Sequence, residues 1–524
     1  MADHPWAERP PPVLLDRLGR PVTVVHLAAE YIPFARTGGL AEAANGLARF
    51  QAFAGIPSAA VMPLYRIARE VAGELEGVGE PFEVRIGERR EMGRVFRQVH
   101  PRERARVYFI QHDGYFDRAG LYGEGGIDYD DNLERWSFFC LAALAVLPRI
   151  VPGPILLHAH DWHTALAVAH LRTSYAGRPE YDAIRTVLSV HNAGYQGHYP
   201  DDRLATPRRP GRRESCRGHY PADRLATIGL PEALYNWRQL EWYGQLNLLK
   251  VGLVFADQVV TVSPNHAREL RTQNGGFGLH EVFSWLGARF TGIVNGIDQR
   301  FWDPGTDRQI ATRYSADDLA PKRACKAALQ RSFGLEERPD VPIFGMAARL
   351  VTQKGLDLIL DGPGLLGLDA QFVFLGAGER RFEEALEAQA AACRGRIAVN
   401  TRFTDHLEHQ LMAGADLILM PCQYEPCGLT QMRAQRYGAL PLVRRVGGLA
   451  DTVDQGVTGF IFDEYHAEPM VGAALRALDL YGRPDEWQFM MREAMARDFS
   501  WERSVARYAV VYRHALAGPA ETLT

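Results

Sequence analysis

The chain has 524 residues, of which 47% are hydrophobic and 23% are charged, and its formal net charge at pH 7 is −4. This length excludes a single small domain, and the composition is that of a globular protein with a core of normal size. The weak net charge gives no overall attraction to nucleic acid or to an anionic membrane, so we expect neither as a partner. Six cysteines are too few for a disulfide scaffold in so long a chain.

The N-terminal residues MADHPWAERPPP are polar and rich in proline, without an apolar signal core. The most apolar segments, SFFCLAALAVLPRIV and NLLKVGLVFADQVVTV, are interrupted by charge or proline well short of the ~20 residues that a membrane-spanning helix needs. We therefore interpret them as buried core and expect a soluble, cytoplasmic protein.

Short apolar runs alternate with helical patterns through the first half of the chain. VTVVHLA at 22–28 predicts a strand, and the segment 39–55 predicts a helix that ends at Gly55. Helical patterns at 131–148 and 240–256 separate several later strands. This alternation predicts β-α units and a parallel, doubly wound sheet. The other predicted strands here are SAAVMPL (58–64), RVYFIQH (106–112), PILLHAH (154–160), RTVLSVHN (185–192) and QVVTVS (258–263).

The pattern restarts near residue 341, and the sequence predicts an α/β protein with two Rossmann-like, doubly wound parallel-sheet domains facing across a cleft. We expect an N-terminal domain over 1–285 and a C-terminal domain over 286–499. The last helical pattern, within 500–524, could pack on either domain and is a candidate to pack back on the first. The predicted strands of the second half are PIFGMAA (342–348), QFVFLGAG (371–378), RIAVN (396–400), LILMP (417–421), LPLVRR (440–445) and TGFIFD (458–463).

One short sequence occurs twice. GHYPDDRLAT at 197–206 returns almost unchanged as GHYPADRLAT at 218–227, with the basic spacer PRRPGRRESCR between the copies. Two copies do not make a solenoid, so we interpret the segment as a local duplication in a surface loop. An added contact with a polyanion or a partner is the alternative.

A glycine-rich turn joins the first predicted strand to its helix, in the sequence FARTGGLAEAANGLARF. Backbone N–H groups at a helix N-terminus bind anions, and Gly38 and Gly39 would let a ligand approach closely. Arg36 would add a permanent positive charge beside them. Such a turn is also often only a turn, so both interpretations stay open.

Histidines follow two of the predicted strands. HAHDWHTA contains His158, His160 and His163 with Asp161, a spacing that resembles a set of metal ligands. No second ligand group accompanies it, so we expect no metal, and a ligand-facing or structural role instead. His191, in VHNAGYQG, ends a neighbouring strand, where a single histidine can be either functional or structural.

Two cations lie on one loop in AARLVTQKGLDL, between a predicted strand and a helix. Arg349 and Lys354, followed by Gly355, would suit a diphosphate. Lysine is rare in this chain and can mark a site that needs a compact ammonium group rather than a guanidinium. The only lysines are Lys250, Lys322, Lys326 and Lys354.

A carboxylate, Glu425, lies in the turn of PCQYEPCGLTQMRAQRYG, after a strand and before a helix. Cys422 and Cys427 have no partner pair at metal spacing and lack the usual dithiol spacing, so we expect neither zinc nor a redox pair. Gly428 permits close approach of a ligand. We therefore interpret Glu425 as a carboxylate presented to a ligand. Together with the two cations it would suit a reaction in which a diphosphate leaves a sugar and the sugar becomes cation-like.

In this order along the chain, the motifs resemble those of bacterial glycogen synthases and plant starch synthases, which are retaining glucosyltransferases with the GT-B fold. The similarity runs from about residue 22 to about residue 515. The motifs that carry it are ARTGGLAE, HAHDWHT, HNAGYQG, VTVSPNHAREL, GIVNGIDQRFWDP, ARLVTQKGLDL, YEPCGLTQ and RYGALPLVRRVGGLADTV.

The resemblance implies transfer of glucose from ADP-glucose to the non-reducing end of an α-1,4-glucan with retention, and no cofactor or metal. In such enzymes the counterparts of Arg349 and Lys354 bind the distal phosphate of the donor, and the counterpart of Glu425 contacts its sugar region. The resemblance therefore implies Glu425, Arg349, Lys354 and His191 as catalytic residues. It implies Arg36, Gly38, Gly39, Asp161, Asn247, Cys427, Gly428, Leu429 and Thr430 as substrate-binding residues, and places Tyr129, Asp131 and Asn132 near the acceptor side.

Three features depart from the family pattern. Arg36 replaces the lysine of the glycine loop, Glu42 replaces an aspartate, and the duplicated insert follows HNAGYQG. Arginine is bulkier and forked, so donor geometry could shift. These departures keep two other functions open: a related transferase that uses UDP-glucose or another acceptor, and a weakly catalytic glucan-binding protein.

Overall fold

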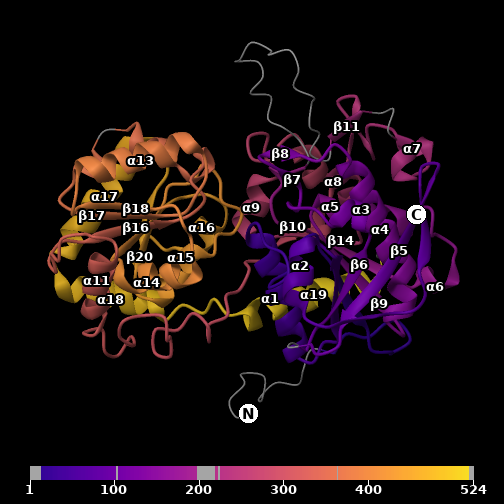
Figure 1. Ribbon diagram of the computed structural model, residues 1–524, viewed down its shortest axis with the longest axis horizontal. Helices are drawn as coiled ribbons and strands as arrows, with labels where there is room; N and C mark the ends of the chain where they lie inside the picture. The colour runs from indigo at the N-terminus through magenta and orange to yellow at the C-terminus, as the bar shows by residue number, and fades with distance from the viewer. Residues whose placement is uncertain (1–12, 102–103, 197–218, 222–224, 363, 519–524) are drawn as a thin grey trace. The chain divides into compact units, whose positions relative to one another are not determined.

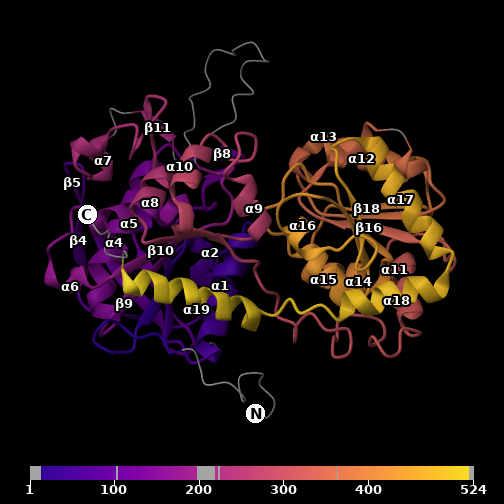
Figure 2. The ribbon, with the colours of Figure 1, turned by 180° about the vertical axis from the view of Figure 1, so that it is seen from behind.

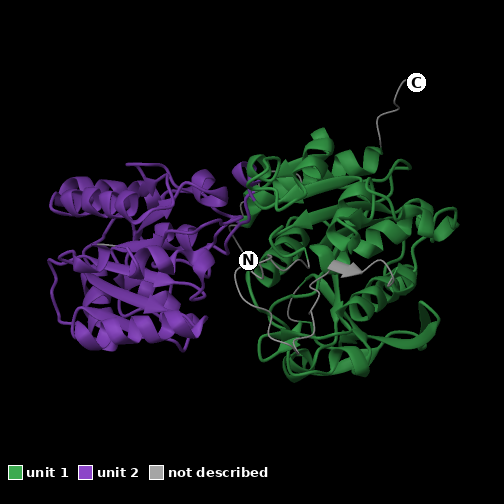
Figure 3. Ribbon diagram, turned by 90° about the horizontal axis from the view of Figure 1, so that it is seen from above, with its two compact units in different colours: residues 1–262, 267–293, 501–524 green, residues 263–266, 294–500 purple. Residues whose placement is uncertain are grey.

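The computed structural model describes residues 13–101, 104–196, 219–221, 225–362 and 364–518. The duplicated segment therefore lies mostly outside the described residues. The chain forms two compact units, shown in different colours in Figure 3. Unit 1 comprises residues 1–262, 267–293 and 501–524, and unit 2 comprises residues 263–266 and 294–500.

Unit 1 is built on a ten-stranded sheet with the strand order β15-β14-β10-β9-β1-β2-β6-β5-β3, with β4 paired to β5 (Figure 1). The strands from β15 to β6 pair in parallel, whereas β3, β4 and β5 form an antiparallel extension. The strands are β1 (Thr23–Leu27), β2 (Ser58–Pro63), β3 (Leu75–Gly77), β4 (Phe82–Ile86), β5 (Arg89–Gln98), β6 (Arg106–Gln111), β9 (Ile155–His160), β10 (Arg185–Val190), β14 (Gln258–Thr261) and β15 (Phe290–Gly292).

Helices cover both faces of this sheet because alternate residues of its parallel strands point to opposite sides. Val24, Leu156 and Val187 share one core cluster with helices α1 and α19, whereas Val25 and Leu157 belong to the cluster on the other face with α4, α5 and α8. The helices of unit 1 are α1 (Gly39–Phe53), α2 (Arg66–Ala72), α3 (Asp113–Phe116), α4 (Asn132–Ile150), α5 (Trp162–Arg172), α6 (Pro179–Asp182), α7 (Leu225–Ile228), α8 (Leu248–Phe255), α10 (His280–Trp285) and α19 (Trp501–Ala517).

The last helix, α19, belongs to unit 1 and packs against α1 (Figure 2). Gly46 of α1 makes this possible, because a Cβ there would lie 2.3 Å from the indole ring of Trp501. The small strands of this unit form two further sheets: β7 (Gly123–Glu124) with β8 (Ile127–Asp128), and β11 (His219–Pro221), β13 (Gln245–Asn247) and β12 (Glu241–Trp242) in that order. Helix α9 (Pro264–Glu269) contains the point where the two units join in sequence.

Unit 2 is built on a six-stranded sheet in the order β18-β17-β16-β19-β20-β21, in which every neighbouring pair is parallel. Helices lie on both sides of it (Figure 1). The strands are β16 (Ile343–Ala347), β17 (Gln371–Leu375), β18 (Ile397–Asn400), β19 (Leu417–Met420), β20 (Leu440–Arg444) and β21 (Phe460–Phe462). The helices are α11 (Lys322–Ser332), α12 (Leu356–Leu360), α13 (Arg380–Ala392), α14 (Asp405–Gly414), α15 (Thr430–Arg436), α16 (Gly447–Thr452), α17 (Ala467–Tyr481) and α18 (Pro484–Met495).

The predicted fold class of two Rossmann-like, doubly wound parallel sheets is confirmed. Within the described part of the chain, no helix combines the length and apolar character needed to cross a bilayer.

Three of the four lysines, Lys250, Lys322 and Lys326, donate to several acceptors each. Lys250 donates to the carbonyl oxygens of Trp237 and Glu241. Lys322, fully enclosed, donates to Ala413 O at 2.7 Å and Tyr437 O at 3.1 Å, which end α14 and α15. Burial lowers the pKa of Lys322 to about 8. Lysine is thus retained where a compact cation must reach several oxygens in the interior.

Candidate functional site

Three neighbouring strands of unit 1 place functional side chains at one edge of its sheet. Strands β1, β9 and β10 are adjacent and parallel, so their carboxyl ends lie together. Glu30 follows β1, Asp161 follows β9 and His191 follows β10. The edge therefore combines two carboxyl groups and an imidazole.

Glu30 holds the glycine loop in place. Its carboxylate accepts hydrogen bonds from Thr37 N and Thr37 Oγ1, both at 2.6 Å, and a longer one from Gly38 N. The hydroxyl of Tyr122 donates to the same carboxylate at 2.6 Å. Sequence reasoning missed Glu30 and Tyr122. Glu30 could have been noticed as an acid at the end of a strand just before the glycines, but no local pattern connects Tyr122 to it.

Neither packing nor backbone conformation within the described residues requires glycine at position 38, and packing does not require it at position 39. A Cβ on Gly38 or Gly39 would meet nothing within 4 Å, and Gly38 has an extended backbone that any residue adopts. The space beside them is open at the start of α1, where the first backbone N–H groups of a helix have no partner within the helix. This arrangement leaves room against the backbone, and the binding of a ligand there stays a prediction.

The two substitutions that depart from the family pattern contact each other. Arg36 Nη1 lies 3.5 Å from Glu42 Oε1, and both side chains are partly exposed. Glu42, on the first turn of α1, therefore meets Arg36, which lies in the loop before the helix. The positive charge of the loop is kept, although its position is set by a different pair of side chains.

Asp161 connects the ends of β9 and β10. Its carboxylate accepts a hydrogen bond from His191 N at 2.7 Å. Its backbone has φ 57° and ψ −177°, a conformation that costs a non-glycine residue about 1–3 kcal/mol. Burial raises the pKa of Asp161 to about 7, against the effect of the backbone N–H groups that it accepts from. Such strain and burial are typical of residues at functional sites.

His191 carries a neutral imidazole. Its Nε2 lies 2.9 Å from Nδ1 of His160, and burial lowers its pKa to about 3. A neutral imidazole at this edge can donate or accept one hydrogen bond to a sugar hydroxyl without introducing charge.

The suspected metal-ligand set in HAHDWHTA is not assembled. The ring of His163 stacks on Trp162 and Tyr122 and is not part of the histidine cluster. The carboxylate of Asp161 accepts a hydrogen bond from His191 N. Instead, ligand atoms of His26, His158 and His160 lie within 4.8 Å of one another, fully buried. Their ring nitrogens are already engaged in hydrogen bonds with Gln51, Tyr512, Ser189, His191 or each other.

Asn247 lies at the start of α8 and is fully buried. Its Oδ1 caps the helix by accepting from Lys250 N at 2.9 Å, and its Nδ2 donates to Gln196 Oε1 at 2.9 Å. Gln196 follows the His191 loop, so Asn247 fixes that loop to α8. Its contact with a sugar stays a prediction.

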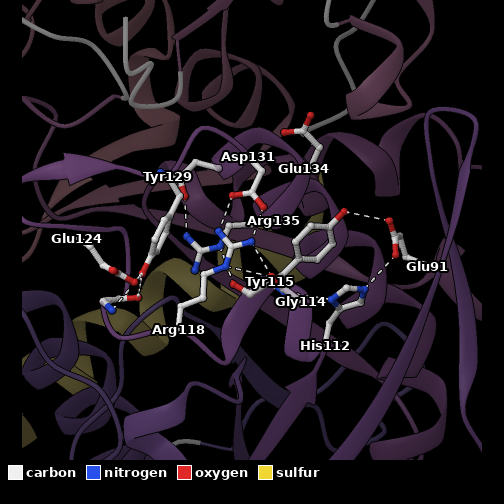
Figure 4. A network of polar contacts seen from close by, with 12 residues as sticks. Glu91, His112, Gly114, Tyr115, Arg118, Glu124, Tyr129, Asp131, Glu134 and Arg135 are labelled. Carbon is white, nitrogen blue, oxygen red and sulfur yellow. Dashed lines mark hydrogen bonds and ion pairs between the residues drawn. The ribbon is translucent and has the colours of Figure 1, made fainter. Parts of the chain in front are cut away.

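A polar network surrounds the segment expected near the acceptor (Figure 4). The guanidinium groups of Arg118 and Arg135 lie 4.6 Å and 4.9 Å from the ring centre of Tyr129. Arg118 also pairs with Asp131, with its nitrogens 2.5 Å and 2.7 Å from the carboxylate oxygens. Asn132 Nδ2 donates to the carbonyl oxygen of Tyr122, the residue that contacts Glu30. The acceptor-side segment is therefore linked to the glycine loop through Tyr122 and Glu30.

In unit 2, two neighbouring strands bring together the predicted donor residues. Strands β16 and β19 pair in parallel, so the loops that follow them meet at the same edge. The first loop carries Arg349 and Lys354, and the second carries Glu425. Lys354 Nζ and Glu425 Oε2 form an ion pair there. The structure thus assembles residues that lie 71 positions apart in the sequence.

In this cluster Lys354 and Glu425 form an ion pair, whereas Arg349 has no charged partner among the described residues. Burial alone would lower the pKa of Lys354, but the Glu425 carboxylate outweighs it, so the pKa lies above its ordinary value. Cys422 Sγ lies 3.6 Å from Glu425 Oε2, and burial raises its pKa to about 12, so this thiol is neutral. The guanidinium of Arg349 is exposed, and it has no ion pair or side-chain hydrogen bond with another described residue. An exposed arginine beside a charged lysine is a fitting site for an anion.

Glycines make the close backbone approaches of this cluster. Gly355 has φ 80°, and a Cβ on it would lie 2.2 Å from Pro421 O. Gly448 packs on the Glu425 loop, where a Cβ would lie 2.1 Å from Cys427 O, and its N–H donates to Glu425 O at 3.0 Å. Any larger residue at these positions would displace the loops that carry Lys354 and Glu425.

The remaining predicted residues follow Glu425 directly. Cys427 is buried with its pKa raised to about 12 by burial, and Gly428, Leu429 and Thr430 are partly exposed at the start of α15. The N–H groups of Gly428, Leu429 and Thr430 donate to no acceptor within the described residues. They are available to oxygen atoms of a ligand.

Stability should depend on pH through the buried histidines. The pKa of His26 is lowered by burial to about 4, and those of His163 and His191 to about 3. The unfolded chain binds protons near pH 6.5 and the folded chain does not, so stability is present above that pH and lost as pH falls. Each group contributes up to about 1.4 kcal/mol per pH unit. Asp161, whose pKa is raised, acts in the opposite direction.

We therefore expect the urea midpoint of unfolding to fall markedly between pH 6.5 and pH 4.5, as measured by tryptophan fluorescence. A midpoint that stays constant or rises across this range would contradict buried neutral imidazoles.

Comparisons with known proteins identify the family of the chain. The family described as "Starch synthase catalytic domain" matches residues 23–215 and 213–285, and "Glycosyl transferases group 1" matches residues 330–492. The chain is 41% identical over 503 residues to the glycogen synthase of Anaeromyxobacter sp. (strain Fw109-5), covering 95% of this chain and 100% of that protein. It is 38% identical to glycogen synthase 2 of Geobacter sulfurreducens, covering 94% of this chain and 98% of that protein.

Solved structures give the same result. The catalytic domain of Starch Synthase IV from Arabidopsis thaliana, bound to ADP and acarbose, matches with a TM-score of 0.82 and 29% identity, covering 95% of this chain and 99% of that one. Sucrose-phosphate synthase from Thermosynechococcus elongatus, at 17% identity and a TM-score of 0.57, shares the fold.

Proposed function

This chain belongs to the glycogen synthase and starch synthase family, and from that premise we propose that its glucosyl donor is ADP-glucose. It is a glucosyltransferase of the GT-B fold that acts as a glycogen or starch synthase. The proposed reaction moves glucose from ADP-glucose to the non-reducing end of an α-1,4-glucan with retention of configuration. The ADP in the plant starch synthase structure supports this choice of nucleotide.

The observation that carries the proposal is the cluster of Lys354, Glu425 and exposed Arg349 at one edge of the unit 2 sheet. In the proposed mechanism the two cations neutralise the diphosphate as its bond to glucose breaks. The free N–H groups of Gly428, Leu429 and Thr430 add donors to the same ligand. Glu425 stabilises the glucosyl unit, which becomes cation-like as the leaving group departs.

Residues of unit 1 complete the proposal on the sugar side. His191 offers its neutral imidazole to a sugar hydroxyl, and Asp161 holds the His191 backbone in place. Gly38 and Gly39 leave space for the donor, with the charge of Arg36 beside them. The leaving phosphate would take the proton of the acceptor hydroxyl on the same face of the sugar, which accounts for retention.

The test is the release of nucleoside diphosphate from ADP-glucose and from UDP-glucose, each with and without a glycogen primer, together with incorporation of glucose into glycogen. We expect release that depends on the primer and a higher kcat/KM with ADP-glucose. Preference for UDP-glucose would overturn the donor assignment, and the contact of Arg36 with Glu42 is the feature that would then need examination. Binding of glycogen without release from either donor would contradict catalysis. The cytoplasmic location stays a prediction.

A further inference from the structure

A continuous row of buried hydrogen bonds connects His191 to helix α1. Nε2 of His191 lies 2.9 Å from Nδ1 of His160, whose Nε2 lies 3.0 Å from Nδ1 of His26. Nε2 of His26 lies 2.8 Å from Oε1 of Gln51 on α1. His26 and His160 are completely buried, so the row has no access to solvent along this length.

Helix α19 determines the orientation of Gln51. The amide Nε2 of Gln51 donates to the hydroxyl oxygen of Tyr512 at 2.7 Å, which leaves Oε1 to face His26. The Tyr512 hydroxyl lies 2.8 Å from Nδ1 of His158, whose Nε2 lies 2.7 Å from Ser189 Oγ. The hydroxyl hydrogen of Tyr512 is therefore directed to His158, and its oxygen accepts from Gln51.

With the Gln51 amide in this orientation, the row has one direction of donation. A neutral imidazole has one N–H and one acceptor nitrogen. Because the Gln51 oxygen can only accept, His26 must donate from Nε2 and accept at Nδ1. His160 then donates from Nε2 to His26 and accepts at Nδ1, and His191 donates from Nε2 to His160.

We propose that Gln51 and Tyr512 are positioning residues that hold His191 in the tautomer protonated on Nε2, so that Nδ1 is an acceptor for a hydroxyl group of the substrate. Nδ1 of His191 has no hydrogen-bond partner within the described part of the chain. The identity of that hydroxyl as part of a nucleotide sugar rests on the proposed function, whereas the tautomer does not.

The same contacts argue against a metal at the three buried histidines. Both ring nitrogens of His26, His158 and His160 already have partners at 2.7–3.0 Å. A metal ion would require two or more of these nitrogens to give up their partners at once. In the hydrogen-bonded arrangement every ring nitrogen of these three histidines keeps its partner.

The test substitutes Gln51→Met, which keeps the shape of the side chain and removes its acceptor. His26 would then have a buried N–H with no acceptor, so the row should reverse and place the proton of His191 on Nδ1. We expect the tautomer ratio to change by roughly tenfold or more, since an unsatisfied buried donor is costly. The measurement is ¹H–¹⁵N NMR of histidine side chains in the full-length protein labelled with ¹⁵N-histidine, with His191 assigned by His191→Asn.

Two further variants separate this role from packing. Tyr512→Phe removes the group that orients Gln51 and should change the same His191 signals, which keeps the test valid if Gln51→Met fails to fold. Tyr181→Phe removes another buried tyrosine hydroxyl, whose partner is Leu144 O at 3.0 Å, and should leave them unchanged.

A His191 protonated on Nδ1 in the native protein, or signals unchanged in both relay variants, would overturn the proposal. Metal bound stoichiometrically by the purified protein would also overturn it. In the active enzyme, Gln51→Met should lower kcat/KM in proportion to the lost fraction of His191 protonated on Nε2. A loss of folding stability alone would not produce this proportionality. The expected tautomers in a protein that releases no nucleotide from either donor would support the relay and overturn the proposed function.

Discussion

Lys354→Ala should lower kcat/KM for ADP-glucose by about 10³-fold, which corresponds to about 4 kcal/mol of transition-state stabilisation. Lys354 is charged in the folded protein because the Glu425 carboxylate raises its pKa despite burial. Its removal takes one of the two predicted donor-binding cations, leaving Arg349, and deprives the carboxylate of its ion-pair partner. The departing diphosphate would then face uncompensated negative charge, so the affinity for ADP should fall as well.

Lys326→Ala is the matched control. Lys326 is another ion-paired lysine of unit 2, more buried than Lys354, with its ammonium 2.8 Å from Asp416 Oδ2 and 2.7 Å from the hydroxyl of Tyr481. Asp416 precedes β19, whereas Glu425 follows it, so the control pair lies at the opposite end of the same strand. This variant should lose stability and keep kcat/KM per folded molecule. Lys354→Ala with native kcat/KM would remove the role assigned to it.

Most of the parallel strands were predictable from sequence because they are buried on both faces and therefore appear as continuous apolar runs, whereas the three-residue edge strand β15 was missed. Strands β1, β9, β16 and β19 all fall inside predicted segments. The antiparallel extension was missed, because β5 is rich in arginine and its side chains are mostly exposed or half-buried. In β4 the sequence does contain a signal, since Phe82, Val84 and Ile86 alternate with exposed charged residues.

The site was predictable to the extent that its residues lie in local motifs at strand ends. Lys354 and Glu425 could be placed at one edge because parallel strands end together. Gln51 and Tyr512 could not, since they lie 461 positions apart and neither belongs to a strand-end motif. The pairing of Arg36 with Glu42 was also missed, although the two departures from the family pattern were visible separately.

Glu425→Gln should separate catalysis from donor binding. The amide keeps the shape of the side chain and removes its charge, so the developing positive charge on the glucosyl unit loses its stabilisation, and kcat should fall by about 10²-fold or more. The Glu425 carboxylate pairs with Lys354, so it would compete with a donor phosphate for the ammonium group. Without it, the dissociation constant of ADP, measured by calorimetry, should stay constant or decrease.

This opposite effect on kcat and ADP affinity distinguishes Glu425 from a residue that only supports the loop. A damaged loop would weaken ADP binding and lower kcat together, because Gly448 and Lys354 both contact it. Asp416→Asn is the matched acid at the other end of β19, where Oδ2 accepts from Ile343 N at 2.9 Å, and it should lower the urea midpoint without changing kcat. If Glu425→Gln weakened ADP binding as strongly as Lys354→Ala does, the carboxylate would be acting through Lys354 and not on the sugar.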